Sequence, residues 1–564
     1  MPGCGSTTMA AVADRDPSTV RDRLTTFVGP ACIALVIAAA VPGLWRSAGA
    51  PMEEGFMLAF PQQLLHGRIP NRDFLHLYGP GSLWVLAAFY KVFGSTITME
   101  RLVGLAQHGV TCLGMYALLR PVSRRIATLG GVTCALILLT PLGLAALAWN
   151  GALACAVCGL ALLIRVMTPS GEAVGFDPGW WRPVGGGVLV GLALLYRPDM
   201  VVALGAAAVL AAWWMTSTVR RRVLIGLVPT LALYIPHLVL AGVGASIKGM
   251  LIQPLVTLRP GRRLPVPPTW GTVDGYLQRT AALQVPNSWA ARLLGTSQQI
   301  FLWFVVAVVV AVALVIGAWW LRRQGDRSPA ANAVVVGGVW AALLITQAVQ
   351  RPDSAHLAWV TGVSIPLVLA LGVELRTRRS PSLRLPALVA TATVGVFLVV
   401  IVPFFPLRAY GDALRIGAER APGGYRITHG DRYFLFGSSD GARSAQRVVN
   451  RLAADSRPGQ RLIVGPVDLS RTVYSDAYLY ALFPELKVGT RYIEMDPGIA
   501  DATSSQLASE LHDGDWLILS RLWNSWNEPN TSTQHRSEAA NVVVRRDYCL
   551  QLDAGGYELF RRCH

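Results

Sequence analysis

Acidic and basic side chains gather in a few short stretches of this 564-residue chain, between long apolar segments. The first stretch opens with Glu53 and Glu54 and ends with Arg72 and Asp73, and His76 follows shortly after. A carboxylate can take a proton from a hydroxyl group, and arginines bind phosphate through charge-assisted hydrogen bonds. We therefore expect a site here that holds an anion and contains a base.

Three other groups of polar residues are expected at the same face of the molecule as this first stretch. Each begins with an arginine, and together they comprise Arg197 with Asp199, Arg259 with Arg262 and Arg263, and Arg351 with Asp353 and His356. Charged groups near a membrane face persist mainly where they pair or bind a ligand. Arg197 and Arg351 either contribute to one anion site or simply pair with the acid two positions later. His356 either carries a proton or caps the start of a helix.

The composition assigns these residues to a membrane protein. Hydrophobic residues make up 53% of the chain and charged residues only 15%, whereas a soluble domain has roughly 25% charged residues. The formal net charge is +17, which in a soluble protein would suggest nucleic acid as a partner. Here the arginines lie mostly between apolar runs, so the charge indicates membrane topology, and we expect no nucleic-acid partner.

We expect a polytopic α-helical membrane protein with about eleven transmembrane helices, because a helix needs ~20 residues to cross ~30 Å of hydrocarbon. The predicted spans are residues 28–46, 98–119, 126–145, 149–167, 184–196, 199–215, 223–243, 299–320, 331–349, 356–374 and 385–405. Residues 80–94 are apolar but too short to cross. Their aromatic and basic residues predict a helix that lies in the interface.

Arginine clusters fall on alternate turns between these spans, and the positive-inside rule makes that side the cytoplasm of a cell membrane. Residues 1–27 then form a cytoplasmic leader, and residues 28–405 form the transmembrane domain. The first outer loop of this domain is 46–97, and its large outer loop is 245–298. Residues 406–564 follow on the outside as a small extracytoplasmic domain.

The last part of the chain differs in character, because short strand-like runs alternate with helical ones. Strands are expected at 461–465, 515–520, 541–547 and 557–563, and helices at 440–454 and 504–512. This alternation predicts a small α/β domain. Cys549 and Cys563 both lie in it. A disulfide between them can persist outside the cell, although the sequence leaves open whether one forms.

The first outer loop carries a resemblance to a known family. The stretch "MEEGFMLAFPQQLLHGRIPNRDF" resembles the first outer loop of the GT-C glycosyltransferases, in which an acidic pair and an amphipathic helix follow an apolar span. "YGPGSLWVLAAFYKVFG" resembles their entry to an interfacial helix, and "GLALLYRPDM" resembles their Arg-Pro-acid turn. Similar families are the protein mannosyltransferases, the lipid A aminoarabinose transferases and the envelope arabinosyl- and mannosyltransferases.

The resemblance implies an enzyme that uses a polyprenyl-phosphate sugar donor. It would move a sugar of the mannose or arabinose class to a hydroxyl of a glycan, lipid or protein acceptor in the cell envelope, with inversion, on the outer face. The family's base is the first acid of the pair, which is Glu53 here. The family usually has an aspartate there, and this departure leaves Glu54 as an alternative. A second family acid corresponds to Asp73 or Asp199.

The remaining polar residues take supporting roles under this resemblance. The donor phosphate is expected to contact Arg72, Arg197, Arg259, Arg263 and Arg351, with His76, Asp199, Asp353 and His356 in support. A divalent cation between Glu53 and Asp73 stays open as a cofactor, but no ligand set in the sequence demands one. The C-terminal domain would bind the acceptor or a partner.

Two other functions remain open at this point. A transporter or flippase of a lipid-linked or soluble substrate would explain the many spans and buried charges. It would, however, place its polar residues at mid-depth, in paired broken helices. A non-enzymatic scaffold for envelope assembly would explain the C-terminal domain but leave Glu53, Glu54 and the arginines without a role.

Overall fold

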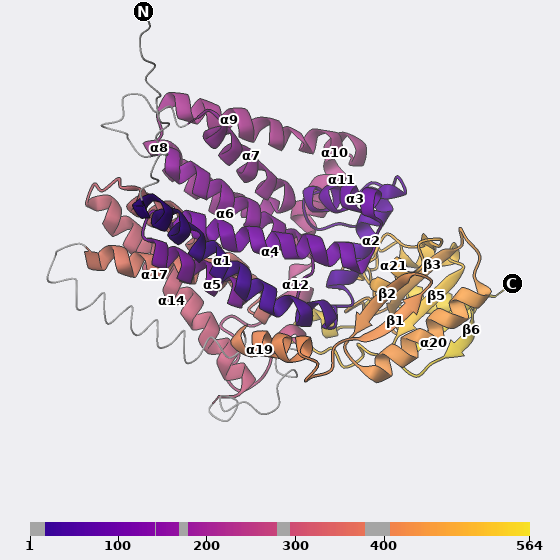
Figure 1. Ribbon diagram of the computed structural model, residues 1–564. Helices are drawn as coiled ribbons and strands as arrows, with labels where there is room; N and C mark the ends of the chain where they lie inside the picture. Colours follow the sequence, from indigo (N-terminus) through magenta and orange to yellow (C-terminus); the bar gives the residue numbers. More distant parts are fainter. Residues whose placement is uncertain (1–16, 142, 168–178, 279–293, 378–405, 564) are drawn as a thin grey trace, which may run out of the picture.

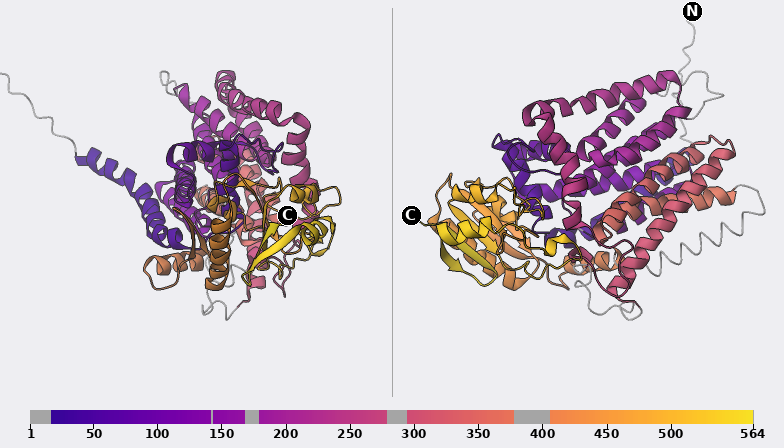
Figure 2. Two further views of the ribbon diagram at one scale, coloured as in Figure 1. Left: turned by 90° about the vertical axis from the view of Figure 1, so that its right-hand side faces the viewer. Right: turned by 180° about the vertical axis from the view of Figure 1, so that it is seen from behind.

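The computed structural model describes residues 17–141, 143–167, 179–278, 294–377 and 406–563. Long helices fill one end of the molecule, and the C-terminal strands and shorter helices form a smaller region at the other end (Figure 1). Two further views show the same division (Figure 2). A mostly helical membrane protein with an appended sheet-containing region is the fold class that the sequence predicts.

Seven helices among the described residues are long and apolar enough to cross a membrane. These candidate spans are Phe27–Arg46, Ile97–Leu119, Ala148–Val166, Ser217–Ala241, Thr296–Arg323, Pro329–Gln350 and Ser354–Thr377. The helices that supply them are α1 (Pro17–Arg46), α4 (Ile97–Leu119), α6 (Ala148–Val166), α9 (Ser217–Ala232), α10 (Tyr234–Ala241), α14 (Thr296–Arg323), α15 (Pro329–Leu343), α16 (Ile345–Gln350) and α17 (Ser354–Thr377).

Three other predicted spans are also helices, but they are short. They are α5 (Arg124–Leu138), α7 (Trp181–Tyr196) and α8 (Val201–Trp214), with 15, 16 and 14 residues. At 1.5 Å per residue they reach only about 21–24 Å, less than the ~30 Å of a bilayer core. The eleventh predicted span, 385–405, lies outside the described residues. The count of eleven crossings therefore stays a prediction.

Local sequence explains where several of these helices begin. The Thr96 hydroxyl accepts a hydrogen bond from the Met99 backbone N–H at 3.2 Å, and so caps α4. Ser123 caps α5 in the same way, through the backbone N–H of Ile126. Such caps satisfy N–H groups that have no partner within the helix. The turn sequences, and not the apolar runs alone, thus fix where these helices start.

Shorter elements connect the long helices near the C-terminal region. The first loop contains α2 (Glu53–Leu65) and α3 (Gly81–Phe93), and α3 is the helix expected from residues 80–94. The large loop contains α11 (Val243–Ile247), the π-helix η2 (Lys248–Thr257) and α12 (Arg259–Arg262). The 3-10 turn η1 (Pro198–Met200) separates α7 from α8. These short elements bring polar residues to one end of the helical part.

The C-terminal region has an α/β architecture. It begins with α19 (Pro406–Gly417) and an antiparallel hairpin of β1 (Tyr425–His429) and β2 (Arg432–Phe436). A second sheet has the order β4-β3-β5-β7-β6, in which β3 pairs in parallel with β4 and β5, and β7 runs antiparallel to β5 and β6. Its strands are β3 (Arg461–Pro466), β4 (Lys487–Val488), β5 (Trp516–Ser520), β6 (Tyr548–Asp553) and β7 (Tyr557–Arg562). The accompanying helices are α20 (Ser439–Asp455), α21 (Tyr478–Leu482), α22 (Leu507–His512) and α23 (Ala539–Asp547), with the 3-10 turn η5 (Thr531–Thr533).

One strand prediction is wrong. Residues 541–547 belong to helix α23, not to a strand. Ala540, Val543 and Val544 are buried, whereas Val542 is 46% exposed. This spacing is that of one face of a helix. The run of three valines led to the strand prediction because β-branched residues favour strands in general. Here the packing of the helix overrides that preference.

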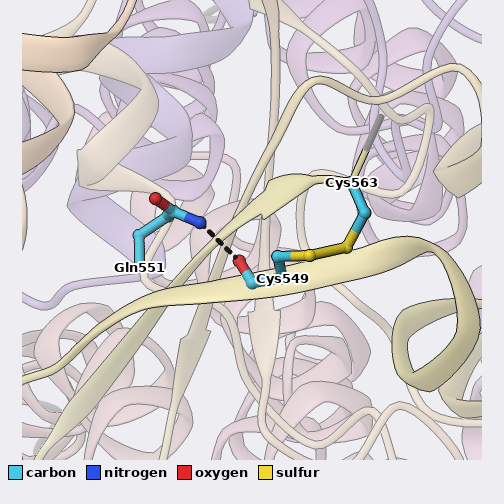
Figure 3. The surroundings of a disulfide bond; sticks show 3 residues. All are labelled: Cys549, Gln551 and Cys563. Carbon is cyan, nitrogen blue, oxygen red and sulfur yellow. Dashed lines mark hydrogen bonds between the residues drawn. A yellow bond between two sulfur atoms is a disulfide. The ribbon is translucent and has the colours of Figure 1, made fainter.

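The two cysteines at the end of the chain form a disulfide. Cys549 at the start of β6 is bonded to Cys563 just after β7, with 5.3 Å between their Cα atoms (Figure 3). The bond therefore joins the outer ends of two paired strands, and the open question from the sequence is answered in favour of the pair.

The C-terminal region rests on the first loop of the helical part through an apolar interface. Phe56 and Met57 of α2 share one buried cluster with Phe434 and Tyr478 of the C-terminal region. A Cβ atom on Gly55 would lie 2.4 Å from the Tyr478 backbone nitrogen, so only glycine permits this approach. The "EEG" sequence thus places the acidic pair directly at the junction between the two regions.

Candidate active site

A cavity of about 200 Å³ lies at this junction, where the ends of the membrane helices meet the C-terminal region. Several residues that the sequence predicts line it, namely Glu53, Arg197, Asp199, Arg259, Arg263, Arg351 and His356. Other polar lining residues are Arg262, Gln347, Glu494 and Asp496. Residues from opposite ends of the chain thus converge on one polar cavity.

Glu53, the first residue of α2, is the acid of the outer-loop pair that faces this cavity. The Tyr474 hydroxyl donates a hydrogen bond to its Oε2 at 2.8 Å and accepts one from the Met52 backbone N–H at 3.0 Å. Burial raises the pKa of Glu53, while the Tyr474 hydrogen bond and the charge of Arg262 oppose this rise. A carboxylate with a raised pKa is a stronger base, as general-base catalysis near neutral pH requires.

Glu54 points elsewhere, because adjacent residues of a helix face different directions. Its two carboxylate oxygens accept hydrogen bonds from Arg101 at 2.7 and 3.0 Å, and both side chains are buried. Arg101 also donates to the backbone carbonyls of Trp45 and Ser47, where α1 ends. The Glu54–Arg101 pair therefore fastens α2 to α4 and to the end of α1, outside the cavity.

Arg197 is matched by the acid two positions later. Its guanidinium donates to both oxygens of Asp199 at 2.8 and 2.6 Å. Its cationic carbon also lies 4.5 Å from the ring centre of Tyr78 and 4.7 Å from that of Trp149. Gln347 donates to Asp199 as well, at 3.0 Å. Arg197 lines the cavity, but its charge is already compensated.

Arg351 is the centre of a larger ion-pair network. It donates to Asp353 at 2.9 Å and to both oxygens of Glu528, a residue of the C-terminal region, at 2.6 and 3.0 Å. Burial raises the pKa of Glu528, but the charge and hydrogen bonds of Arg351, the Tyr276 backbone N–H and the charge of Arg262 together hold this pKa below its usual value. The other oxygen of Asp353 caps the start of α17 and contacts the His356 ring at 2.8 Å. Arg351 thus ties the helical part to the C-terminal region.

Arg259 and Arg263 differ from these two arginines. Both flank the short helix α12 at the rim of the cavity and are exposed. Among the described residues, neither makes an ion pair. Arg262 between them contacts Asp496 at 3.3 Å. Arg259 and Arg263 are therefore the lining arginines whose charge stays available for an anion.

Besides Glu54 and Asp353, three other predicted residues do not line the cavity. Arg72 and Asp73 form a bidentate pair with each other at 2.9 Å on the surface. His76 is fully buried between the rings of Phe60 and Tyr78. Burial lowers the pKa of His76 to about 3, so this residue is neutral at physiological pH. The structure does not bring these residues together with Glu53.

The sequence did not point to the contributions of the C-terminal region. Tyr474, Glu494, Asp496 and Glu528 all reach the cavity or its ion pairs from residues that follow 405. The stretches "SRTVYSDAYL", "RYIEMDPG" and "SWNEPN" hold Tyr474, Glu494 with Asp496, and Glu528 beside aromatic or apolar residues, which is one available signal. A single sequence gives no means of pairing them with residues several hundred positions earlier.

The structure also bears on metal ligands. Asp73 is absent from the cavity that Glu53 lines, so these two acids do not form one ligand set. In the part of the chain that the structure describes, three potential metal ligands come together at Asp468, His535 and Glu538. They lie on the surface of the C-terminal region, outside the cavity, and His535 already contacts Asp468 at 2.9 Å.

Comparisons with known proteins address the fold. No family model matches the sequence, and no curated protein matches it. The structure of ArnT from Cupriavidus metallidurans bound to undecaprenyl phosphate is similar, with a TM-score of 0.50 and 14% identity, over 94% of this chain and 97% of that one. The Archaeoglobus fulgidus oligosaccharyltransferase in the apo form gives a TM-score of 0.45 at 12% identity, over 95% of this chain and 75% of that one. The chain therefore has the fold of ArnT, which is the GT-C fold that the first outer loop indicated.

Proposed function

We propose that this protein is a membrane glycosyltransferase that moves a sugar from a polyprenyl-phosphate donor to a hydroxyl group of an envelope acceptor. The observation that carries the proposal is the environment of Glu53. This carboxylate faces a cavity lined by arginines, and Tyr474 fixes its position by a 2.8 Å hydrogen bond. The fold of ArnT supports the same assignment, because the matched ArnT structure holds a polyprenyl phosphate.

The donor would enter along η2 and present its phosphate at α12. Met250, Leu255 and Leu258 give this side of the cavity an apolar lining. Leu251, Ile252 and Val256 of η2 are large apolar side chains that stay exposed. An isoprenoid tail could cover such a surface inside a bilayer. The phosphate would then meet Arg259 and Arg263, whereas Arg197 and Arg351 would shape the cavity as compensated ion pairs.

The chemistry would be a single displacement at the anomeric carbon. Glu53 takes the proton of the acceptor hydroxyl as its oxygen forms the new glycosidic bond. The bond between the anomeric carbon and the phosphate oxygen breaks, and the lipid phosphate leaves with the electron pair. Arg259 and Arg263 stabilise the charge that grows on this phosphate, which lowers the barrier and not only the ground state.

The position of the ionic residues makes transport the weaker proposal. The ionic residues of the cavity lie at helix ends, since Arg197 follows α7, Arg351 follows α16 and Glu53 begins α2. A transporter site would instead sit in interrupted helices near mid-depth. We further propose that the cavity faces the outside of a cell membrane, because the Cys549–Cys563 disulfide suits an oxidising compartment.

The test is sugar transfer in membranes supplied with radiolabelled polyprenyl-phosphate mannose or arabinose. Replacing Glu53 with Gln should lower the rate by about 10²- to 10⁴-fold, the range that a general base contributes. The matched control is Glu419→Gln, an exposed glutamate that does not line the cavity, which should transfer at the native rate.

Two outcomes would contradict this proposal. Undiminished transfer by Glu53→Gln would remove Glu53 as the base, and a loss in Asp73→Asn instead would move the base to Asp73. Absence of transfer from either donor by a folded native protein would refute the glycosyltransferase assignment and favour transport or a scaffold.

A further inference from the structure

Two carboxylates on the C-terminal wall of the cavity each keep one oxygen without a hydrogen-bond partner in the described part of the chain. Glu494 is 6% exposed and Asp496 is 1% exposed, and both line the cavity. Within the described residues, Glu494 Oε1 and Asp496 Oδ2 have no hydrogen-bond partner. Buried polar atoms are nearly always satisfied, so two free oxygens on neighbouring side chains indicate a missing ligand.

The backbone between these acids is itself specialised. Met495 is fully buried and adopts φ = +52°, in the left-handed region that residues with a side chain rarely occupy. Such conformations persist where the surrounding structure enforces them, often at functional sites. The fold therefore holds Glu494 and Asp496 against the cavity at an unfavourable backbone position.

The chemistry of the surroundings restricts the ligand. It must exchange hydrogen bonds with carboxyl oxygens, and a hydroxyl group can donate to an ionised carboxylate and accept from a protonated one. A divalent cation fits poorly, since the Arg262 guanidinium already lies 3.3 Å from Asp496 and would repel it. The cavity wall also carries Arg259 and Arg263, which add positive charge. A neutral ligand with several adjacent O–H groups satisfies both carboxylates without this repulsion.

We propose that Glu494 and Asp496 form the subsite that binds the hydroxyl groups of the sugar ring. This inference rests on the proposed function and deepens it, because it gives the C-terminal region a direct part in substrate recognition. The cavity then has two adjoining parts, with the arginines at α12 for the phosphate and the carboxylates beside them for the sugar. Glu53 lies near these carboxylates, and its charge, after burial and Asp496, contributes to raising the pKa of Glu494.

The decisive variant is Glu494→Gln, because Asp496 also contacts Arg262 and its replacement would disturb a second interaction. Losing one charge-assisted hydrogen bond to a substrate hydroxyl should raise KM about 10- to 100-fold. We would measure KM and kcat with the polyprenyl-phosphate sugar that the native enzyme transfers, and thermal unfolding of each variant. Glu419→Gln again serves as the control, with native KM and native unfolding temperature.

Substrates that lack one hydroxyl distinguish the two sources of the sugar. If the subsite binds the transferred sugar, one deoxy-sugar donor binds the native enzyme more weakly than the full donor does. With Glu494→Gln, the same deoxy donor and the full donor bind equally well. If the subsite binds a sugar of the acceptor, a deoxy-acceptor shows this pattern instead of the deoxy-sugar donor. Either pattern supports the subsite, since coupling between a side chain and one hydroxyl requires that they interact.

The outcomes that overturn the proposal are equally specific. An active Glu494→Gln enzyme with native KM for both substrates would exclude the subsite. A fall in unfolding temperature with unchanged KM would assign Glu494 a structural role, and Mn²⁺ binding that Glu494→Gln abolishes would assign the pair to a metal. A folded native protein that binds no donor and transfers no sugar would instead refute the proposed function, and the subsite with it.

Discussion

The acids on the two sides of the cavity differ in how they are paired. On the membrane side, Glu54 is bound by Arg101 and Asp199 by Arg197, each through two short hydrogen bonds. On the C-terminal side, Glu494 and Asp496 are as deeply buried but each keeps one oxygen without a partner. These four acids are therefore alike in burial and differ in pairing.

The energetics give this difference its meaning. Removing one partner of a buried ion pair leaves an uncompensated charge and costs about 3–5 kcal/mol. Removing a buried charge that has no full partner relieves a desolvation penalty instead. Variants of the first kind should weaken the fold, and variants of the second kind should weaken function while they preserve or increase stability.

The largest expected effect is that of breaking the Arg351 network. Arg351→Met would leave Asp353 and Glu528 buried without their cation, and we expect a loss of about 3–5 kcal/mol in the free energy of unfolding. Thermal unfolding of the purified protein measures it. The control is Arg259→Met at the exposed rim, which should change stability by less than about 0.5 kcal/mol. Equal stability of Arg351→Met and the native protein would end the distinction between paired and unpaired groups.

A pH series of unfolding measurements sharpens the same comparison, with effects of about 1.5–3 kcal/mol. The pKa of Glu528 is lowered in the fold, because the charge and hydrogen bonds of Arg351, with the Tyr276 backbone N–H and the charge of Arg262, together outweigh burial. The stabilisation that ionised Glu528 contributes is fully present above the pKa that this residue has in the unfolded chain. It is lost as the pH falls through the lower pKa that the residue has in the folded protein. Glu528→Gln should therefore be less stable than the native protein at neutral pH, and the gap should close in acid.

Glu494 should behave in the opposite way. Burial and the charge of Asp496 raise its pKa well above the usual value. The native protein then loses stability as the pH rises from the pKa of Glu494 in the unfolded chain, near 4.5, to its higher pKa in the folded protein. Glu494→Gln removes this loss, so it should equal the native protein in acid and exceed it at neutral pH. If both variants shift in the same direction, the acid paired with an arginine and the acid without one are not different in kind.

The smallest expected effect concerns Tyr474, which connects the two sides. Its hydrogen bond lowers the pKa of Glu53 against the effect of burial. In Tyr474→Phe this pKa should rise further, because the hydrogen bond that lowers it is lost. The acidic limb of the pH profile of kcat/KM should move to higher pH, because only ionised Glu53 accepts a proton. An unmoved limb would separate Tyr474 from the base.

The helical part was largely predictable from the sequence, because long apolar runs and basic turns are local signals. The same holds for β3, β5 and β7, whose short apolar runs coincide with the strands. Helix α23 was missed because a run of valines is ambiguous without its packing partners. The span count stayed open because the apolar runs at α5, α7 and α8 give helices shorter than a bilayer core.

The candidate site was predictable only in part. Arg197 with Asp199 and Arg351 with Asp353 were visible because their partners are two residues away, and the pairing alternative holds for both. The choice between Glu53 and Glu54 depends on which neighbour each one faces, and Arg101 and Tyr474 are 47 and 421 residues distant from them. Sequence patterns carry no information about contacts of that range.

That 421-residue distance also sets a time order for the protein's synthesis. At about 5–20 residues per second, Tyr474 emerges roughly 20–80 s after Glu53. Glu528, which completes the Arg351 network, comes later still. Once Thr377 has been made, the nascent chain has its described membrane helices but neither the wall of the cavity nor the group that orients Glu53. The site is therefore assembled last, so the proposed transfer cannot begin before synthesis of the chain is nearly finished.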